Sequence, residues 1–490
     1  MSEFENDYDA LREDISVQVG PPVFETGENG KAFLNQQFFA KLAVEVYNPI
    51  FEKTEDAFYL YVPESGLWVR QDEPAMIYKL SLMMMDFAEE TSDSFINSKR
   101  TVGTIKSILR FMQADECCGR ENAFEHKGEP YIHCGNGVIT FPVQEDGRRK
   151  PTLMPFDPKY MSRNRTEFNY REDAICHEFQ DRLIKPAMSE DDMHHLQLYV
   201  GQCLLGVNRS QTILLMVGTA GGGKSTAVNI FEKLVNRQNC TELRLEQMGS
   251  RFETQRLLGK TLLTAKDVRS DFLASRWASK LKALTGKDKL TIERKGSNDA
   301  SDICGEYNVI ITANNTLCVA LDGDAEAWKR RLILIEYNNP PPKEKIADFD
   351  DYLLAREGDG ILTWAVEGAM LLLENDGKIV KSEVQKKKVN NLLHESDPVA
   401  AYLSSHLDLA NDKDATVTSE ELLKAFHAYC KDQGWTLPPR KDVQSRIPDY
   451  IFRYYGISKR TDVKRAGTNR RGYYGLKLQA GSTFISSNIN

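Results

Sequence analysis

VGTAGGGKST (217–226) decides the fold of this chain, because it satisfies the pattern GxxxxGK[ST] between an apolar strand and a helix. The run QTILLMV (211–217) that leads into it is continuously apolar, as is typical of a strand buried in a parallel sheet. The glycines let the backbone curl so that its N–H groups face phosphate oxygens, and the helix that begins near Lys224 adds its partial positive charge. The stretch therefore predicts a phosphate-binding loop in an α/β domain.

The loop predicts ATP and Mg²⁺ as cofactors. Lys224 is expected to neutralise the β- and γ-phosphates, and Ser225 is expected to ligate Mg²⁺. The residues expected to surround the nucleotide are Gly218, Thr219, Ala220, Gly221, Gly222, Gly223, Lys224, Ser225 and Thr226. A phosphate loop alone names no reaction, because kinases, GTPases and motor proteins share it.

Three further apolar runs follow at 261–265, 307–313 and 331–337, and their alternation with helical segments indicates an α/β sheet. Such a sheet binds its ligands at the carboxyl ends of its strands. Asp267 lies at the end of the first run and is expected to hold Mg²⁺. Asn314 lies at the end of the second run and is expected to orient the attacking water or the γ-phosphate.

Arg330 directly precedes the last of these runs, and Arg331 begins it. An arginine near a γ-phosphate stabilises the charge of the transition state, and ring-shaped ATPases supply it from the neighbouring subunit. Both arginines are candidates for that role, and the sequence leaves open which one acts. The catalytic candidates are therefore Lys224, Asp267, Asn314, Arg330 and Arg331.

ALTGKDKLTIERKG (283–296) lies between the acid and the asparagine, and its pattern predicts two short strands around a Gly-bearing turn. Sequence-tolerant contact with single-stranded DNA requires neutralisation of its phosphates. The basic residues that are expected to supply this contact are Lys287, Lys289, Arg294 and Lys295.

The order of these parts between residues 218 and 331 resembles that of the superfamily 3 helicases of viruses, phages and plasmids. The resemblance implies an AAA+ core, a hexameric ring, and a hairpin that projects into the ring channel and grips single-stranded DNA. Lys295 falls at the position of the hairpin-tip lysine, whereas Gly296 stands where papillomavirus-type members carry histidine. The pair Lys266–Asp267 is a second departure, because family members commonly carry two acids there.

The flanking segments resemble the phage and poxvirus primase-helicase branch of that superfamily. YVPESGLWVR (61–70) and CGNGVITF (134–141) resemble its amino-terminal module. Fewer than fifty residues precede this module, so priming activity is not expected on this chain. The expected domains are an acidic flexible tail (1–30), an amino-terminal α+β module (31–170), a superfamily 3 AAA+ motor with a helical lead-in (171–385), a winged-helix DNA-binding domain (386–480) and a tail (481–490).

The last hundred residues predict a winged helix. TVTSEELLKAFHAYCKDQG (416–434) opens with a capping box made by Thr418 and Glu421, and residues 456–478 predict a β-hairpin with a basic tip. Residues 436–480 hold eleven Lys and Arg against three Asp, which gives a net charge of +8. The residues expected to contact duplex DNA are Arg460, Lys464, Arg465, Arg470 and Arg471.

Composition limits the class of protein. The 490 residues carry a formal charge of −8, which excludes a protein that coats nucleic acid along its whole length but permits local basic surfaces. Nine cysteines without a CxxC pair fit a reducing compartment. The acidic start holds no secretory signal, and the apolar stretch at 75–88 is too short to span a membrane. We therefore expect a cytoplasmic protein, in a bacterial host or an infected cell, with no membrane partner.

Together these features predict an ATP-dependent replicative DNA helicase of a phage, virus or mobile element. It would work as a homo-hexameric ring on single-stranded DNA, and the resemblance implies translocation from 3′ to 5′. Two alternatives stay open: an origin-binding initiator that uses ATP for assembly and duplex melting, and a nucleotide-switched regulator without turnover. The expected partners are single-stranded DNA in the ring channel, duplex DNA at the winged helix, and a separate primase or polymerase.

Overall fold

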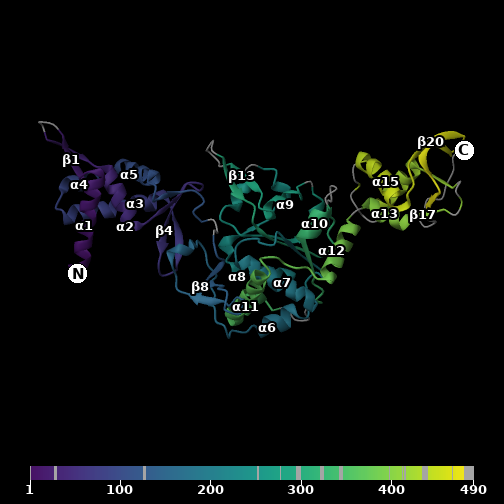
Figure 1. Cartoon of the computed structure of the whole chain (residues 1–490), viewed down its shortest axis with the longest axis horizontal. Helices are drawn as coiled ribbons and strands as arrows, with labels where there is room; N and C mark the ends of the chain where they lie inside the picture. Colours follow the sequence, from purple (N-terminus) through teal and green to yellow (C-terminus); the bar gives the residue numbers. More distant parts are fainter. Residues whose placement is uncertain are drawn as a thin grey trace.

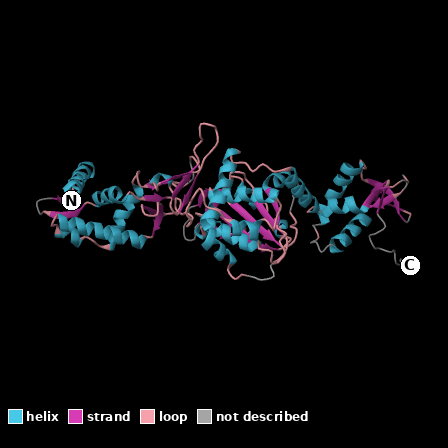
Figure 2. Ribbon diagram, turned by 90° about the horizontal axis from the view of Figure 1, so that it is seen from below, coloured by secondary structure: helices cyan, strands magenta, loops and turns pink. Residues whose placement is uncertain are grey.

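Five parallel strands form the central sheet, in the order β11-β12-β15-β10-β16. Figure 2 shows this sheet in magenta in the middle of the molecule, with cyan helices around it. The strands are β10 (Ile213–Val217), β11 (Cys240–Glu242), β12 (Leu262–Val268), β15 (Asn308–Ala313) and β16 (Leu332–Glu336). The apolar runs of the sequence are thus buried parallel strands, and the predicted α/β core is confirmed. Because β15 lies between β10 and β12, the strand that leads to Asn314 separates the phosphate-loop strand from the acid-bearing strand.

This computed structural model arranges the chain in three lobes along its longest axis, with the amino-terminal lobe at one end and the carboxyl-terminal lobe at the other (Figure 1). Among the helices of the described ranges, none combines the length and the apolarity needed to cross a membrane. The described residues are 2–26, 30–124, 128–250, 253–275, 277–293, 300–319, 325–341, 346–396, 398–410, 412, 415–432, 437, 440–465 and 467–478.

The central sheet buries both of its faces. Ile213 and Leu215 of β10 enter one hydrophobic core, and Leu214 and Met216 enter the other, as the alternation of side chains along a strand requires. The helices that cover one face are α7 (Glu190–Leu204), α8 (Lys224–Val235) and α11 (Phe349–Glu374). The helices that cover the other face are α9 (Lys280–Thr285), α10 (Ala325–Arg331) and α12 (Glu383–Glu395).

Short elements connect these helices and strands. The segment that leads into α7 holds α6 (His177–Phe179) and a π-helical turn (Gln180–Ile184). The 3-10 turns are Pro158–Tyr160, Arg237–Asn239, Leu245–Gln247, Thr254–Leu257 and Phe272–Ala274.

Helices α7 and α11 approach each other backbone to backbone. A Cβ on Gly201 of α7 would lie 2.2 Å from the amide nitrogen of Ala369. A Cβ on Gly368 of α11 would lie 2.1 Å from the carbonyl oxygen of Gln197. No real Cβ sits that close to a backbone atom, so both glycines are needed for the helices to pack at this separation.

The amino-terminal lobe combines helices with two small sheets. Its helices are α1 (Ser2–Val19), α2 (Gln36–Tyr47), α3 (Glu73–Glu90), α4 (Ser94–Ser98) and α5 (Val102–Ala114). Its strands are β1 (Val23–Thr26), β2 (Lys31–Leu34), β3 (Ile50–Glu52), β4 (Ala57–Val62), β5 (Leu67–Gln71) and β6 (Gly119–Arg120). β4 and β5 pair antiparallel, and Pro63–Gly66 form the turn between them.

The expectation of a flexible tail at 1–30 is wrong, because α1 and β1 occupy most of that range. Ile15 is 1% exposed and packs into the core of the amino-terminal lobe. The Arg12 guanidinium lies over the rings of Tyr8 and Phe87, at 4.3 and 4.6 Å from their centroids. These contacts attach α1 to the rest of the lobe.

The boundary expected at residue 170 also differs. The three-stranded sheet before it consists of β7 (Tyr131–Cys134), β8 (Gly137–Thr140) and β9 (Thr152–Met154). Ile132 and Ile139 of this sheet pack in the same hydrophobic core as α7, α8 and α11. The segment that was assigned by sequence to the amino-terminal module therefore shares its core with the central domain.

The boundary expected between residues 385 and 386 falls inside α12. Leu392 and Leu393 near the end of α12 enter the core of the central domain, whereas the core of the carboxyl-terminal lobe begins at Val399. The domain division therefore follows α12 instead of preceding it.

The basic hairpin is displaced along the chain from its predicted position. β13 (Lys289–Glu293) pairs antiparallel with β14 (Ala300–Cys304), and the preceding residues 280–285 form α9. Gly286 ends that helix, so it does not form the hairpin turn. Three residues of the predicted tip lie outside the described residues: Arg294, Lys295 and Gly296.

The carboxyl-terminal lobe follows the predicted order of helices and a basic hairpin. Its helices are α13 (Pro398–His406), α14 (Ser419–Asp432) and α15 (Arg440–Tyr455). Its strands are β17 (Leu407–Leu409), β18 (Thr416–Thr418), β19 (Arg460–Arg465), β20 (Thr468–Tyr474) and β21 (Leu476–Leu478). The capping box is formed, because the Thr418 N–H donates to Glu421 Oε2 at 2.8 Å and the Glu421 N–H donates to Thr418 Oγ1 at 3.1 Å. The winged-helix assignment stays a prediction.

Gly201→Ala should destabilise the central domain by about 1–3 kcal/mol, because the added methyl group forces α7 and α11 apart. Thermal unfolding followed by circular dichroism would record this as a lower Tm. Gly103→Ala in α5 is the matched control, since a Cβ there meets no atom within 4 Å and alanine has the higher helix propensity. An unchanged Tm for Gly201→Ala would contradict the close approach of the two helices.

Candidate functional site

The phosphate loop joins β10 to α8 and lies against the segment that follows β16. A Cβ on Gly218 would lie 1.9 Å from the carbonyl oxygen of Tyr337, and a Cβ on Gly222 would lie 2.5 Å from that of Asn339. Gly218 and Gly223 have φ angles of 155° and 105°, which side-chain-bearing residues rarely adopt. The glycines are therefore required both for the turn and for the close approach to the neighbouring segment.

Lys224 is the first residue of α8 and is 3% exposed. Its Nζ donates hydrogen bonds to the carbonyl oxygens of Gly218 (2.7 Å) and Thr219 (2.8 Å) and to Oδ1 of Asn314 (2.9 Å). Burial lowers the pKa of Lys224, and the charge of Asp267 opposes that shift. The three hydrogen-bonded oxygens are neutral, so phosphate oxygens would give the ammonium stronger, charge-assisted hydrogen bonds.

Ser225 and Asp267 meet beside the loop, where Ser225 Oγ donates to Asp267 Oδ2 at 3.2 Å. A β-bulge between Ala265 and Val268 interrupts the pairing of β12 with β15, and Asp267 adopts a φ of 51° within it. The bulge redirects the carboxylate, and the Asp267 N–H donates to Thr312 Oγ1 at 2.9 Å. A hydroxyl and a carboxylate are oxygen ligands of the kind that Mg²⁺ takes, so this pair fits the predicted metal site.

The remaining loop residues line the same turn. Thr219, Ala220 and Gly221 are exposed between β10 and α8, whereas Thr226 is half-buried in the first turn of α8. Every residue that was predicted to surround the nucleotide therefore lies in the turn between β10 and α8 or in the first turn of α8.

Lys266, which stands where family members carry a second acid, binds α8. Its Nζ lies 2.8 Å from Glu232 Oε2 and 2.7 Å from Asn229 Oδ1. The other carboxylate oxygen of Glu232 accepts a hydrogen bond from Thr264 Oγ1 at 2.6 Å. Lys266 and Glu232 thus attach β12 to α8, and neither side chain replaces the second acid.

Strand β15 connects the basic hairpin to Asn314 at the candidate nucleotide site. Asn314 follows the carboxyl end of β15, and β14 of the basic hairpin ends four residues before β15 begins. The hairpin base is fixed to α9, because the Tyr307 N–H donates to the Leu284 carbonyl oxygen at 2.9 Å. The Gly305 N–H donates to the Asp288 carbonyl oxygen at 2.8 Å. A displacement of Asn314 along the axis of β15 would therefore reach the hairpin.

Of the two candidate arginines at the end of α10, Arg330 is exposed and Arg331 is buried. Arg331 is 5% exposed, and a Cβ on Gly286 would lie 3.1 Å from its Nη2, so its guanidinium packs against the hairpin base. In this conformation Arg331 cannot reach another subunit, which leaves Arg330 as the candidate for a trans-acting arginine. Lys381 donates to the Arg330 carbonyl oxygen at 2.9 Å and so caps this helix, while burial lowers the pKa of Lys381 to about 8.

The DNA-binding candidates lie in two separate places. Lys287 and Lys289 are exposed at the base of the hairpin, where Lys287 Nζ lies 3.3 Å from Glu306 Oε1. Arg294 and Lys295 fall outside the described residues. The exposed candidates of β19 and β20, in the carboxyl-terminal lobe, are Arg460, Lys464, Arg465, Arg470 and Arg471.

Two of the arginines in that lobe are held by carboxylates. Arg465 Nε lies 3.0 Å from Glu421 Oε1, and Arg460 Nη2 lies 2.6 Å from Asp462 Oδ2. These ion pairs reduce the charge that both arginines can offer to phosphate groups.

Three residues around the nucleotide site were not predicted as part of it: Thr312, Tyr337 and Asn339. Thr312 binds the backbone of the acid-bearing bulge, and the other two support the phosphate loop. The polar pair Asn338–Asn339 directly after the apolar run at 331–337 was a readable signal, because strand ends of an α/β sheet carry its ligands.

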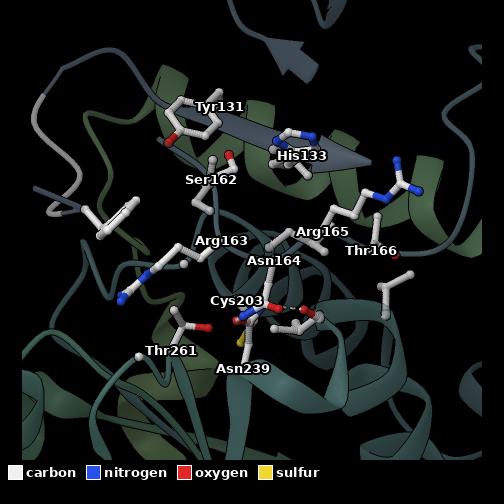
Figure 3. Close-up of a pocket in the computed structure, with 18 of the residues that line it drawn as sticks. Tyr131, His133, Ser162, Arg163, Asn164, Arg165, Thr166, Cys203, Asn239 and Thr261 are labelled. Carbon is white, nitrogen blue, oxygen red and sulfur yellow. Dashed lines mark hydrogen bonds between the residues drawn. The ribbon is translucent and has the colours of Figure 1, made fainter. Parts of the chain in front are cut away.

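A cavity of about 100 Å³ lies at the opposite edge of the central sheet (Figure 3). Asn239 and Thr261, which line it, directly precede β11 and β12, whereas the phosphate loop follows the carboxyl end of β10. Its other wall is formed by β7 and by the segment from Met161 to Thr166. The cavity is therefore separate from the nucleotide site, and its polar lining suits ordered water.

His133 of this lining is 6% exposed and stacks on Phe156, with ring centroids 5.1 Å apart and an angle of 16° between the planes. Burial lowers the pKa of His133 to about 4. The imidazole is therefore neutral at neutral pH.

Comparisons with known proteins give a family match in the motif region and alignments with solved structures over most of the chain. Residues 216–331 match a family of unknown function, DUF5906. Two solved apo structures of the NrS-1 C-terminal region align with this chain at 14% identity and a TM-score of 0.45. The alignment with the A form covers 89% of this chain and 98% of the NrS-1 chain. The alignment with the structure of NrS-1 residues 305–718 covers 90% of this chain and 99% of the NrS-1 chain. A search of curated proteins finds no match.

Lys224→Met should abolish binding of ATP and Mg²⁺, because methionine removes the charge that faces the phosphates. Titration with a fluorescent ATP analogue would measure the loss, which we expect to exceed about a hundredfold in Kd, or about 2.7 kcal/mol. Lys386→Met, at an exposed lysine of α12, is the charge-matched control. Equal affinities for the wild type and Lys224→Met would contradict the assignment of this loop.

His133→Phe should flatten the acid dependence of stability. Folding lowers the pKa of His133 from 6.5 to about 4, so the unfolded state binds more protons between these values. The wild type should lose about 2–3 kcal/mol of stability from this group between pH 7 and pH 4.5, whereas His133→Phe should not. Urea unfolding at both pH values would measure the difference, with the exposed His177→Phe as control. Equal acid sensitivity of the wild type and His133→Phe would contradict the shift.

Proposed function

We propose that this chain is an ATP-dependent replicative DNA helicase of a phage, virus or mobile element. The observation that carries the proposal is the convergence of Lys224, Asp267 and Asn314 at one edge of a parallel sheet. The strand that leads to Asn314 also begins directly after a hairpin that carries basic residues. One strand thereby joins the candidate nucleotide site to the candidate DNA-contacting element, which supports a DNA motor.

Each residue of the site has a defined part in ATP hydrolysis. The N–H groups of the phosphate loop and the start of α8 bind the β- and γ-phosphates, and the Lys224 ammonium moves from its neutral partners to the phosphate oxygens. Ser225 and Asp267 would hold Mg²⁺, which would neutralise charge on the phosphates. Asn314 orients the water that attacks the γ-phosphate.

The hydrogen bond between Lys224 and Asn314 supplies a coupling step. Asn314 Oδ1 now accepts from Lys224 Nζ at 2.9 Å. When the ammonium binds a phosphate group, Asn314 changes its partner and the end of β15 moves with it. Because β15 follows the hairpin strand β14 closely in the chain, this movement reaches the basic residues that bind single-stranded DNA.

A hexameric ring is part of the proposal, and Arg330, which is exposed on α10, is the candidate for its trans-acting arginine. In a ring this arginine would stabilise the γ-phosphate charge in the neighbouring subunit. The strand order, with β15 between the strands of the phosphate loop and the acid, supports an AAA+ motor. The family match at 216–331 spans the same set of residues, from the end of β10 to Arg331.

An origin-binding initiator is the second candidate. The observation that favours it is the separate lobe at 398–478, whose exposed basic hairpin would contact duplex DNA. Footprinting distinguishes the two functions, since an initiator protects one defined duplex sequence whereas a motor protects none.

Hydrolysis and unwinding should separate in hairpin variants. Lys289→Ala combined with Lys295→Ala should lower unwinding of a forked DNA at least about tenfold, because phosphate contacts are lost, while ATP turnover without DNA continues. Lys224→Ala should lose both activities. A fluorescence unwinding assay and phosphate release measure them, with Lys386→Ala as control. Unwinding by the hairpin variant at the wild-type rate would contradict the role of the hairpin, and absence of ATP turnover in the wild type would contradict the motor.

A further inference from the structure

Helix α15 of the carboxyl-terminal lobe carries an exposed tyrosine, Tyr454, beside a tyrosine that packs against the core of the lobe, Tyr450. Val443, Ile447 and Ile451 of this helix enter the core of the lobe. Tyr450 is half-buried and packs against that core, whereas Tyr454 is 52% exposed. A single exposed aromatic ring is common on protein surfaces, so exposure of Tyr454 alone does not identify a binding site.

The arrangement of these tyrosines gives the second observation. The rings of Tyr450 and Tyr454 are stacked, with centroids 5.8 Å apart and an angle of 10° between the planes. The guanidinium of Arg446 lies 5.7 Å from the centroid of Tyr450 on the same flank. Residues four apart share one side of a helix, so Arg446, Tyr450 and Tyr454 form a ladder whose exposed end is Tyr454.

The segment that carries the ladder is strongly positive, although it includes Asp449 next to Tyr450. Arg453 is exposed and lies next to the Arg446 flank by helical periodicity, because seven residues make nearly two turns. The segment 436–480, which includes α15 and the basic hairpin, carries a net charge of +8. A flat aromatic surface with arginines at its border is complementary to an unpaired base and the phosphates beside it.

We propose that this tyrosine ladder (Arg446, Tyr450, Arg453 and Tyr454) binds single-stranded DNA by stacking an unpaired base on Tyr454. The ligand is unpaired because a base inside a duplex offers no free face for stacking. Arg453 contacts the adjacent phosphate group, and Arg446 fixes Tyr450 against the second tyrosine ring. The inference goes beyond the proposed motor, since it places a second contact for single strands outside the motor domain.

Binding to an abasic probe tests the proposal. We would measure the anisotropy of a fluorescein-labelled 20-nucleotide oligo(dT), and of the same oligonucleotide with a central run of six abasic sites, on the full chain. The assay contains no ATP, so it measures DNA binding even if the protein does not hydrolyse ATP. A failure of this proposal is thereby distinguishable from a failure of the proposed motor function. The wild type should bind the intact probe about tenfold more tightly, which corresponds to one stacked base.

Variants on the two flanks of α15 locate the contact. Tyr450→Ala combined with Tyr454→Ala should remove the preference for the intact probe, and Tyr454→Phe should retain it because phenylalanine still stacks. Phe452→Ala is the matched control, since Phe452 is 61% exposed on the opposite flank of the same helix. An equal loss of affinity for both probes, or loss of the preference in Phe452→Ala, would overturn the proposal.

Photocrosslinking gives an independent location. An oligonucleotide with 5-iodouracil should crosslink to the peptide that contains Tyr454, as mass spectrometry would show. Crosslinks confined to residues 280–305 would overturn the proposal. A changed oligomeric state in the double tyrosine variant, with unchanged affinity for both probes, would also overturn it and assign the ladder to a contact between protein chains.

Discussion

The hydrogen bonds of the Lys224 ammonium hold the carboxyl edge of the central sheet together. They join the phosphate loop, through Gly218 and Thr219, to Asn314, the residue that follows β15. Burial lowers the pKa of this lysine, and the charge of Asp267 opposes that shift. The glycine contacts with Tyr337 and the bulge at Asp267 place the other groups around this one charge.

Local patterns made the central domain predictable from sequence. Strands buried on both faces leave continuous apolar runs, and a glycine-rich turn before a helix is specified by adjacent residues. α1 was missed although Tyr8, Leu11, Ile15 and Val19 recur at helical spacing, because many acidic residues between them favoured a disordered tail. The sequence pattern places the hairpin too early in the chain, because a glycine such as Gly286 is typical of a turn. In the structure Gly286 ends α9, and the hairpin follows it.

Contacts between distant segments could not be predicted in the same way. Nothing adjacent to Arg331 in the chain indicates that it packs under Gly286, so sequence could not separate it from the exposed Arg330. The β7–β8 hairpin likewise resembles a small independent unit until its isoleucines are seen in the core of the central domain. Domain boundaries depend on which core a segment enters, and that is a property of the folded chain.

Helix α12 gives the nucleotide site a physical connection to the carboxyl-terminal lobe. The side-chain amide of Gln385 accepts from the Leu334 N–H (3.1 Å) and donates to its carbonyl oxygen (2.7 Å), so α12 is bound to the edge strand β16. Leu317, three residues after Asn314, is buried against the end of the same helix, where Ser396 Oγ donates to its carbonyl oxygen at 3.4 Å. α13, the first helix of the carboxyl-terminal lobe, begins two residues after Ser396. A shift of the Asn314 segment would therefore move the end of α12 and, with it, the start of that lobe. If the proposed function holds, ATP binding at one edge of the sheet would act on both candidate DNA-binding surfaces, through β15 on the hairpin and through α12 on the carboxyl-terminal lobe.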